Sequence, residues 1–201
     1  MKSKKIAILA SGGANFASVF HALVKIGCSP LVSKSIADLQ KADAMILPGV
    51  GSAGFAMTQL KELGLADFLG SQQKPILGIC LGKQLLCSSS QEEDATCLGV
   101  IPLRVQKLRG PRILPHMGWN HFIEIADHEP LLKGITPKDN FYFIHSYAAE
   151  IAKPSTIGIC DYFGQFSAAI RRDNFFGVQF HPEKSGIPGL KILQNFIDIK
   201  V

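Results

Sequence analysis

A single cysteine stands where the chain is best suited to nucleophilic chemistry. Cys80 lies in the sequence GICLG (residues 78–82), which follows one apolar run and precedes another. This pattern predicts a buried strand that turns sharply into a helix, with the cysteine at the turn, as in a nucleophile elbow. Gly78 and Gly82 would relieve the crowding of such a turn, and unpaired N–H groups at the helix start favour a thiolate. We therefore predict that Cys80 is the nucleophile of an enzyme.

One of the six histidines is well situated to act as the base. His181 follows the apolar residues 177–180 and opens the tripeptide His181-Pro182-Glu183. In an extended segment, positions two apart project to the same side, and we expect the proline to keep this segment extended. Glu183 would then orient the imidazole while the other ring nitrogen faces the thiol, which is the logic of a catalytic triad. A surface turn is the alternative for the tripeptide alone.

An acyl-transfer site also needs backbone N–H donors for the oxyanion. We expect one from Leu81, directly after the nucleophile. A second is expected from the segment Gly49-Val50-Gly51, which follows another buried run. The alternative for that segment is an ordinary strand-to-helix turn.

These residues need a parallel sheet to position them. Strands are predicted at residues 6–10, 30–33, 44–47 and 75–79. Helices are predicted at 16–26, 53–63 and 81–87, with a short continuation of the second at 64–69. Alternation at this spacing implies βαβ units. Strand-like runs at 122–125, 140–145, 156–161, 167–171 and 175–180 suggest antiparallel additions, and a final helix is expected at 189–199. The prediction is a three-layer α/β fold with a mostly parallel central sheet.

Composition limits the possible classes of protein. With 201 residues and 47% hydrophobic content, one domain spanning residues 1–201 is expected. Five scattered cysteines without a secretory signal argue against a disulfide framework and favour a reducing cytoplasm. The net charge is +5, but basic residues do not cluster with aromatic ones, so no nucleic-acid partner is expected. No metal motif and no membrane-spanning stretch are seen.

The only tryptophan lies in the segment PHMGWN (residues 115–120), which we interpret as a loop. Tryptophan beside glycine and asparagine is typical of an interface, and an aromatic anchor in the core is the alternative. Residues 141–147 read as a strand that ends in polar side chains, either lining a pocket or forming a sheet edge.

Taken together, these motifs resemble the class I glutamine amidotransferases. Within that family the chain is most similar to the glutaminase subunits of imidazole glycerol phosphate synthase, through residues 47–57, 78–86, 115–120, 142–147, 176–186 and 189–196. The resemblance implies a flavodoxin-like fold and hydrolysis of L-glutamine through a thioester on Cys80, with His181 as acid and base and Glu183 as its orienting group. It implies no cofactor and no metal.

The resemblance also assigns the remaining site residues and a partner. Val50, Gly51 and Leu81 match the oxyanion region, and the positions that hold glutamine match Gly49, Gln84, Glu92, Ser146 and Tyr147. The implied partner is a (β/α)8-barrel cyclase subunit, joined in a heterodimer that passes ammonia between the subunits. Positions at that interface match Asn15, Trp119, Asn120, Tyr142 and Lys184.

Two departures from the family pattern leave an alternative open. Lys83 stands where the family usually has methionine, and residues 10–15 differ from the usual loop. A Lys83 ammonium that points inward could favour a thiolate, whereas one that points outward would not affect the chemistry. The alternative function is a paralogous glutaminase that supplies ammonia to a surface-polysaccharide sugar amidotransferase.

Overall fold

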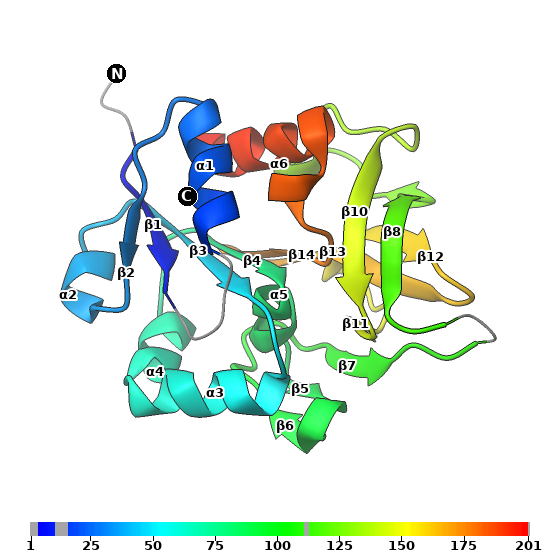
Figure 1. Cartoon of the computed structure of the whole chain (residues 1–201), viewed down its shortest axis with the longest axis horizontal. Helices are drawn as coiled ribbons and strands as arrows, with labels where there is room; N and C mark the ends of the chain where they lie inside the picture. The colour runs from blue at the N-terminus through cyan, green and yellow to red at the C-terminus, as the bar shows by residue number, and fades with distance from the viewer. Residues whose placement is uncertain (1–3, 11–15, 111–112, 201) are drawn as a thin grey trace.

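The computed structural model of this protein describes residues 4–10, 16–110 and 113–200. Strands and helices alternate in the first half (Figure 1): β1 (Ile6–Leu9), α1 (Phe16–Lys25), β2 (Leu31–Ser33), α2 (Ile36–Leu39), β3 (Ala44–Gly49), α3 (Ala53–Glu62), α4 (Leu65–Gly70), β4 (Ile76–Cys80) and α5 (Leu81–Leu86). The second half contains mainly strands: β5 (Ser89–Ser90), η1 (Glu92–Asp94), β6 (Ala95–Thr96), β7 (Arg104–Lys107), β8 (His116–His121), β9 (Glu124–Ile125), η2 (Pro130–Leu132), β10 (Asn140–His145), β11 (Tyr147–Ala149), β12 (Thr156–Asp161), β13 (Gln165–Arg172), β14 (Phe175–Val178), η3 (Pro182–Lys184) and α6 (Gly186–Asp198).

A parallel set of strands forms the centre of the main sheet. β2, β1, β3, β4 and β14 lie side by side in that order and run parallel. Every residue of β1, β3, β4 and β14 is buried, as expected for strands covered on both faces. At the carboxyl end of the sheet, Gly49 of β3 pairs with Cys80 of β4. The loop after β3 therefore starts beside the predicted nucleophile.

Mainly antiparallel strands extend the sheet beyond β14, although β5 pairs parallel with β7. β13 pairs antiparallel with β14, and β11, β7, β5 and β6 follow outward, while β12 and β9 branch from β13. β8 and β10 form a separate antiparallel pair, in which Trp119 faces Tyr142 in register. The predicted α/β class, with a mostly parallel centre and antiparallel additions, is confirmed.

Two apolar clusters cover the opposite faces of the main sheet and give three layers. α1 and α6 lie on one face, where Leu23 and Phe196 join one buried cluster. α3 and α4 lie on the other face, where Leu60 and Leu65 join the second cluster (Figure 1). The helices face the sheet through residues three or four apart, such as Val19, Ala22 and Leu23 of α1.

Some sequence expectations about individual elements are wrong. Residues 116–121 form strand β8 rather than a loop, because pairing with β10 outweighs the poor strand preference of glycine and asparagine. Residues 64–69 do not continue α3, since Gly64 adopts a φ of 66° and a new helix, α4, begins at Leu65. Only residues 124–125 of the predicted strand 122–125 are a strand, and α6 begins three residues earlier than expected, at Gly186.

Candidate active site

Cys80 lies at a strained turn between β4 and α5. Its φ of 54° and ψ of −111° are outside the regions that L-residues ordinarily occupy. Such conformations typically cost about 1–3 kcal/mol and persist only where the surrounding structure enforces them. The residue is 8% exposed, so the sulfur is held in a partly enclosed position.

Three glycines allow β3, β4 and α5 to approach closely at this turn. A Cβ added to Gly82 would lie 1.8 Å from the carbonyl oxygen of Leu47 in β3. A Cβ on Gly78 would lie 2.6 Å from the carbonyl group of Gly82, and one on Gly49 would lie 2.8 Å from the Gly82 nitrogen. The crowding predicted at this elbow therefore arises because the backbones of β3, β4 and α5 touch one another directly.

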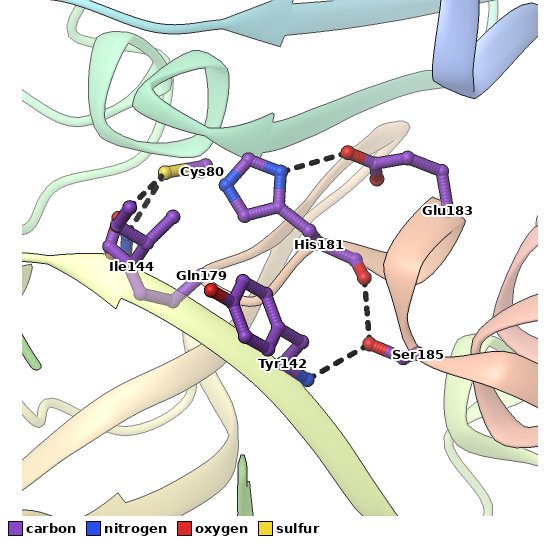
Figure 2. A network of polar contacts seen from close by, with 7 residues as sticks. All are labelled: Cys80, Tyr142, Ile144, Gln179, His181, Glu183 and Ser185. Carbon is purple, nitrogen blue, oxygen red and sulfur yellow. Dashed lines mark hydrogen bonds and ion pairs between the residues drawn. The ribbon is translucent and has the colours of Figure 1, made fainter. Parts of the chain in front are cut away.

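His181 and Glu183 form the second part of the site. Nδ1 of His181 lies 2.8 Å from Oε1 of Glu183, and the two side chains are 6% and 3% exposed. The segment between them is the 3-10 turn η3 (Pro182–Lys184), so the predicted extended geometry is wrong although the contact is present. The His181 N–H donates to the Tyr142 carbonyl. The Ser185 hydroxyl donates to the His181 carbonyl (Figure 2).

The pKa of His181 reflects its charged neighbours. Burial lowers the pKa of His181, but the Cys80 sulfur and the Glu183 carboxylate outweigh burial and raise it to about 10. Nε2 of His181 and Oε2 of Glu183 are buried, and neither has a hydrogen-bond partner among the described residues. A cationic imidazole favours the thiolate of a neighbouring cysteine.

The Cys80 sulfur has two polar contacts besides the imidazole that faces it (Figure 2). Its thiol donates to the carbonyl of Ile144 in β10 at 3.7 Å. The amide nitrogen of Gln179, which follows β14, lies 3.8 Å from the sulfur and donates to it. Residues from β4, β10 and the end of β14 therefore converge on the sulfur.

The sulfur opens into a cavity of about 290 Å³, which is near the lower end of the size range for small-molecule sites. Seven residues predicted to serve the oxyanion or to hold glutamine line it: Val50, Gly51, Leu81, Gln84, Glu92, Ser146 and Tyr147. The other lining residues are Cys80, His181, Pro115, Ile144 and His145. Gly49 does not line the cavity but lies beside Cys80 in the sheet.

Gln84 and Glu92 both line this cavity and are each held by hydrogen bonds. The Gln84 amide donates to the Tyr147 carbonyl at 2.9 Å and to Oε1 of Gln179 at 3.4 Å. Oε2 of Glu92 accepts the backbone N–H of Ala53, at the start of α3, at 3.0 Å. Burial raises the pKa of the Glu92 carboxyl, and this hydrogen bond opposes the shift.

A buried histidine pair lies next to the cavity. Burial lowers the pKa of His145 to about 3, so its ring is neutral at pH 7. Its Nδ1 donates to the Tyr147 carbonyl at 2.9 Å, which leaves Nε2 as an acceptor for Nδ1 of His116 at 3.0 Å. His116 also lies 3.5 Å from the Asn120 amide nitrogen. These contacts connect β8 to the cavity wall.

The predicted interface residues gather on one face. Trp119 is 61% exposed, and its ring lies 5.8 Å from that of Tyr142, over which the ammonium of Lys184 sits at 6.0 Å. Trp119 and Asn120 also line a separate hollow of about 430 Å³. Asn15 lies outside the described residues.

Sequence reasoning missed three participants in the site. Ile144 acts through its backbone carbonyl, which leaves no signal in the sequence. His145 is one of the six histidines, and its position in the sequence does not distinguish it from the others. Gln179 did carry a signal, because a polar residue between Val178 and Phe180 must find hydrogen-bond partners once buried.

Metal-binding clusters and membrane-spanning helices are both absent from the described part of the chain. It contains no cluster of three or more histidine, cysteine or carboxylate side chains that could hold a metal ion. It also contains no helix that is long and apolar enough to cross a membrane.

Comparison with known proteins gives a consistent result. Residues 7–199 match the protein family described as glutamine amidotransferase class-I. The chain is 45% identical over 202 residues to imidazole glycerol phosphate synthase subunit HisH of Photorhabdus laumondii, covering 97% of this chain and 100% of that protein. It is 44% identical over 196 residues to the same subunit of Salmonella typhimurium, covering 96% and 99%.

Solved structures agree in fold. A crystal structure described as a glutamine amidotransferase aligns with a TM-score of 0.73 at 18% identity, covering 95% of this chain and 98% of that chain. A putative GMP synthase protein from Thermoplasma acidophilum aligns with a TM-score of 0.70 at 20% identity, covering 98% and 94%.

Proposed function

This chain belongs to the class I glutamine amidotransferase family, and we propose that it hydrolyses L-glutamine with a triad of Cys80, His181 and Glu183. One observation carries the proposal: a cysteine at a strained turn and an imidazole held by a carboxylate meet in one cavity. A nucleophile, its base and the group that orients the base are what acyl transfer through a covalent intermediate requires.

The reaction proceeds in two halves. The Cys80 sulfur attacks the side-chain amide carbon of glutamine, and the C–N bond breaks as His181 gives a proton to the departing ammonia. His181 then takes a proton from water, which attacks the thioester and releases glutamate and the thiol. The buried Nε2 of His181 suits this exchange of protons, because no other group of the described residues forms a hydrogen bond with it. Glu183 keeps Nε2 directed at the sulfur through its bond to Nδ1.

Backbone groups beside the sulfur serve the oxyanion. We assign this role to Leu81 and to the loop of Val50 and Gly51, all of which line the cavity. Gly49 anchors that loop beside Cys80. The glutamine itself would be held by Gln84, Glu92, Ser146 and Tyr147, whose amide, carboxylate, hydroxyl and backbone groups surround the remaining cavity.

The chain functions as the glutaminase subunit of imidazole glycerol phosphate synthase in histidine biosynthesis. Identities of 43 to 45% to HisH subunits, over 96 to 97% of this chain, support this role. The same similarity favours the histidine pathway over the surface-polysaccharide alternative.

We further propose that the protein works in the cytoplasm as one half of a heterodimer with a (β/α)8-barrel cyclase. Ammonia is mostly ammonium in water at neutral pH and is then not nucleophilic, so a docked path between subunits keeps it reactive. The exposed ring of Trp119, with Asn120, Tyr142 and Lys184 near it, is the face we assign to the cyclase. Asn15 is assigned to the same interface from the sequence alone.

The test is a glutaminase assay on the two-subunit complex. We expect Cys80→Ala to abolish glutamate release while the variant still co-purifies with the cyclase. Cys28→Ser is the matched control, because Cys28 is a partly exposed cysteine that does not line the cavity. Measurable glutamate release by Cys80→Ala would contradict the nucleophile assignment.

A further inference from the structure

A lysine is buried next to the nucleophile. Lys83 of α5 is 0% exposed, and its ammonium points inward. Nζ donates to the backbone carbonyl of Ser167 in β13 and to Oε1 of Gln179 at 3.2 Å. Long charged side chains are almost never fully buried without partners, so this arrangement requires an explanation.

The fold provides a slot for this side chain. Gly177 of β14 has no Cβ, and one added there would lie 2.6 Å from Cγ of Lys83 and 3.0 Å from its Cβ. The aliphatic part of the lysine therefore occupies space that only a glycine leaves open. The two hydrogen bonds of Nζ then hold the ammonium at the inner end of this slot.

Lys83 fixes the orientation of the Gln179 amide. An ammonium can only donate, so the amide oxygen of Gln179 must face it, and the Gln84 amide also donates to that oxygen at 3.4 Å. The amide nitrogen of Gln179 is thereby turned to the Cys80 sulfur, at 3.8 Å (Figure 2). A chain of contacts thus runs from the ammonium to the nucleophile.

The charge of Lys83 has few possible partners. Burial lowers the pKa of Lys83 to about 8, so it is mostly cationic at pH 7, and the nearby sulfurs of Cys87, Cys80 and Cys160 oppose this shift. Within the described residues, none of the ion pairs includes Lys83.

Two of the three neighbouring sulfurs remain thiols. Burial raises the pKa of Cys87 to about 12 and also raises that of Cys160. Lys83 also helps to lower the pKa of His145, whose ring is neutral at pH 7. Of these neighbours, the Cys80 sulfur is the one that the proposed reaction requires as an anion.

We propose that Lys83 is a positioning residue for the glutaminase reaction, which holds the Gln179 amide against the Cys80 thiolate and supplies a second positive charge, besides that of His181, that stabilises it. This inference rests on the proposed function. Lys83 forms no bond to glutamine and transfers no proton in either half of the reaction. Its effect is on the fraction of Cys80 that is ready to attack.

The test measures alkylation of Cys80 by iodoacetamide between pH 6 and 10, followed by mass spectrometry of its peptide. The full chain in its complex carries Cys28→Ser, so that the other three cysteines are buried. Lys83→Met removes the charge and the donor but keeps an unbranched chain. We expect the midpoint of the pH profile to rise by about one unit and alkylation at pH 7 to slow about tenfold, because the variant loses both a nearby positive charge and the group that holds the Gln179 donor at the sulfur.

Two further variants make the result decisive. Lys61→Met removes an exposed lysine of α3 and should leave the profile unchanged. Gln179→Met removes the donor at the sulfur and should shift the pH profile of alkylation in the same direction as Lys83→Met. It replaces Lys83→Met in the test if that variant does not fold. An unshifted profile in the folded variants overturns the proposal. Because alkylation requires no glutamine turnover, a failure of the proposed function would appear separately, as absent glutamate release by the unmodified complex.

Discussion

Replacing Gly82 with alanine should damage both stability and catalysis, because the added methyl group meets a backbone rather than a flexible side chain. The new Cβ would lie 1.8 Å from the carbonyl oxygen of Leu47, whereas ordinary contact begins at 3.4 Å. Helix α5 must therefore move away from β3 by about 1.6 Å, or the central strand must bend. Either movement displaces Cys80 and the N–H of Leu81 together.

The expected cost can be estimated from this displacement. Overpacking typically costs about 1–3 kcal/mol, and we expect the upper end, about 3 kcal/mol, because β3 is a buried central strand with little room to relax. A misplacement of about 1 Å at a reacting group can reduce turnover about 100-fold. We therefore expect kcat/KM for glutamine to fall by about that factor.

Chemical denaturation of the isolated protein and a glutamate-release assay on the complex would measure the two effects. Gly70→Ala is the matched control, because a Cβ at Gly70, the last residue of α4, has no neighbouring atom within 4 Å. It should leave activity intact and change stability by less than about 1 kcal/mol. If Gly82→Ala were as stable and as active as Gly70→Ala, the contact between α5 and β3 would not be what enforces the elbow.

Two more predictions concern the histidine pair and the exposed face. The pKa of His145 is about 3 in the folded protein and 6.5 as a free side chain, so the unfolded chain binds more protons between these values. The free energy of unfolding should therefore fall as pH drops from about 6.5 to 3. In denaturation experiments at several pH values, its slope against pH should be flatter in His145→Asn by up to about 1.4 kcal/mol per pH unit. Separately, Trp119→Ala should weaken binding to the cyclase by at least about 2 kcal/mol, roughly 30-fold, in a titration of the two subunits, whereas equal affinity would place the interface elsewhere.

The elbow could be predicted from sequence because its signal is local. A buried run, a cysteine and flanking glycines define a strand, a turn and a helix without reference to distant residues. The contact between His181 and Glu183 was also predictable, since the residues are only two apart. The backbone conformation that joins them was not, because the 3-10 turn is held by contacts of Ser185 with Tyr142 in β10, which is far away in the sequence.

The rest of the site depends on such distant contacts. Nothing in the sequence indicates that the carbonyl of Ile144 reaches the Cys80 sulfur, or that the amide of Gln179 does so as well. The direction of Lys83 could not be predicted either, because it depends on the space left by Gly177, almost a hundred residues further along the chain. Strand β8 was missed because its sequence has weak strand preference and its pairing partner begins about twenty residues later.

The backbone contacts of Gly49, Gly78 and Gly82 restrict which amino acids can replace these glycines. Any other amino acid is costly at each of these positions, because a Cβ there would lie under 3.0 Å from the backbone around the elbow. The face around Trp119 has no comparable restriction on its exposed side chains. Substitutions can therefore accumulate on that face and alter how the protein docks, while the geometry that breaks the amide bond is inherited unchanged.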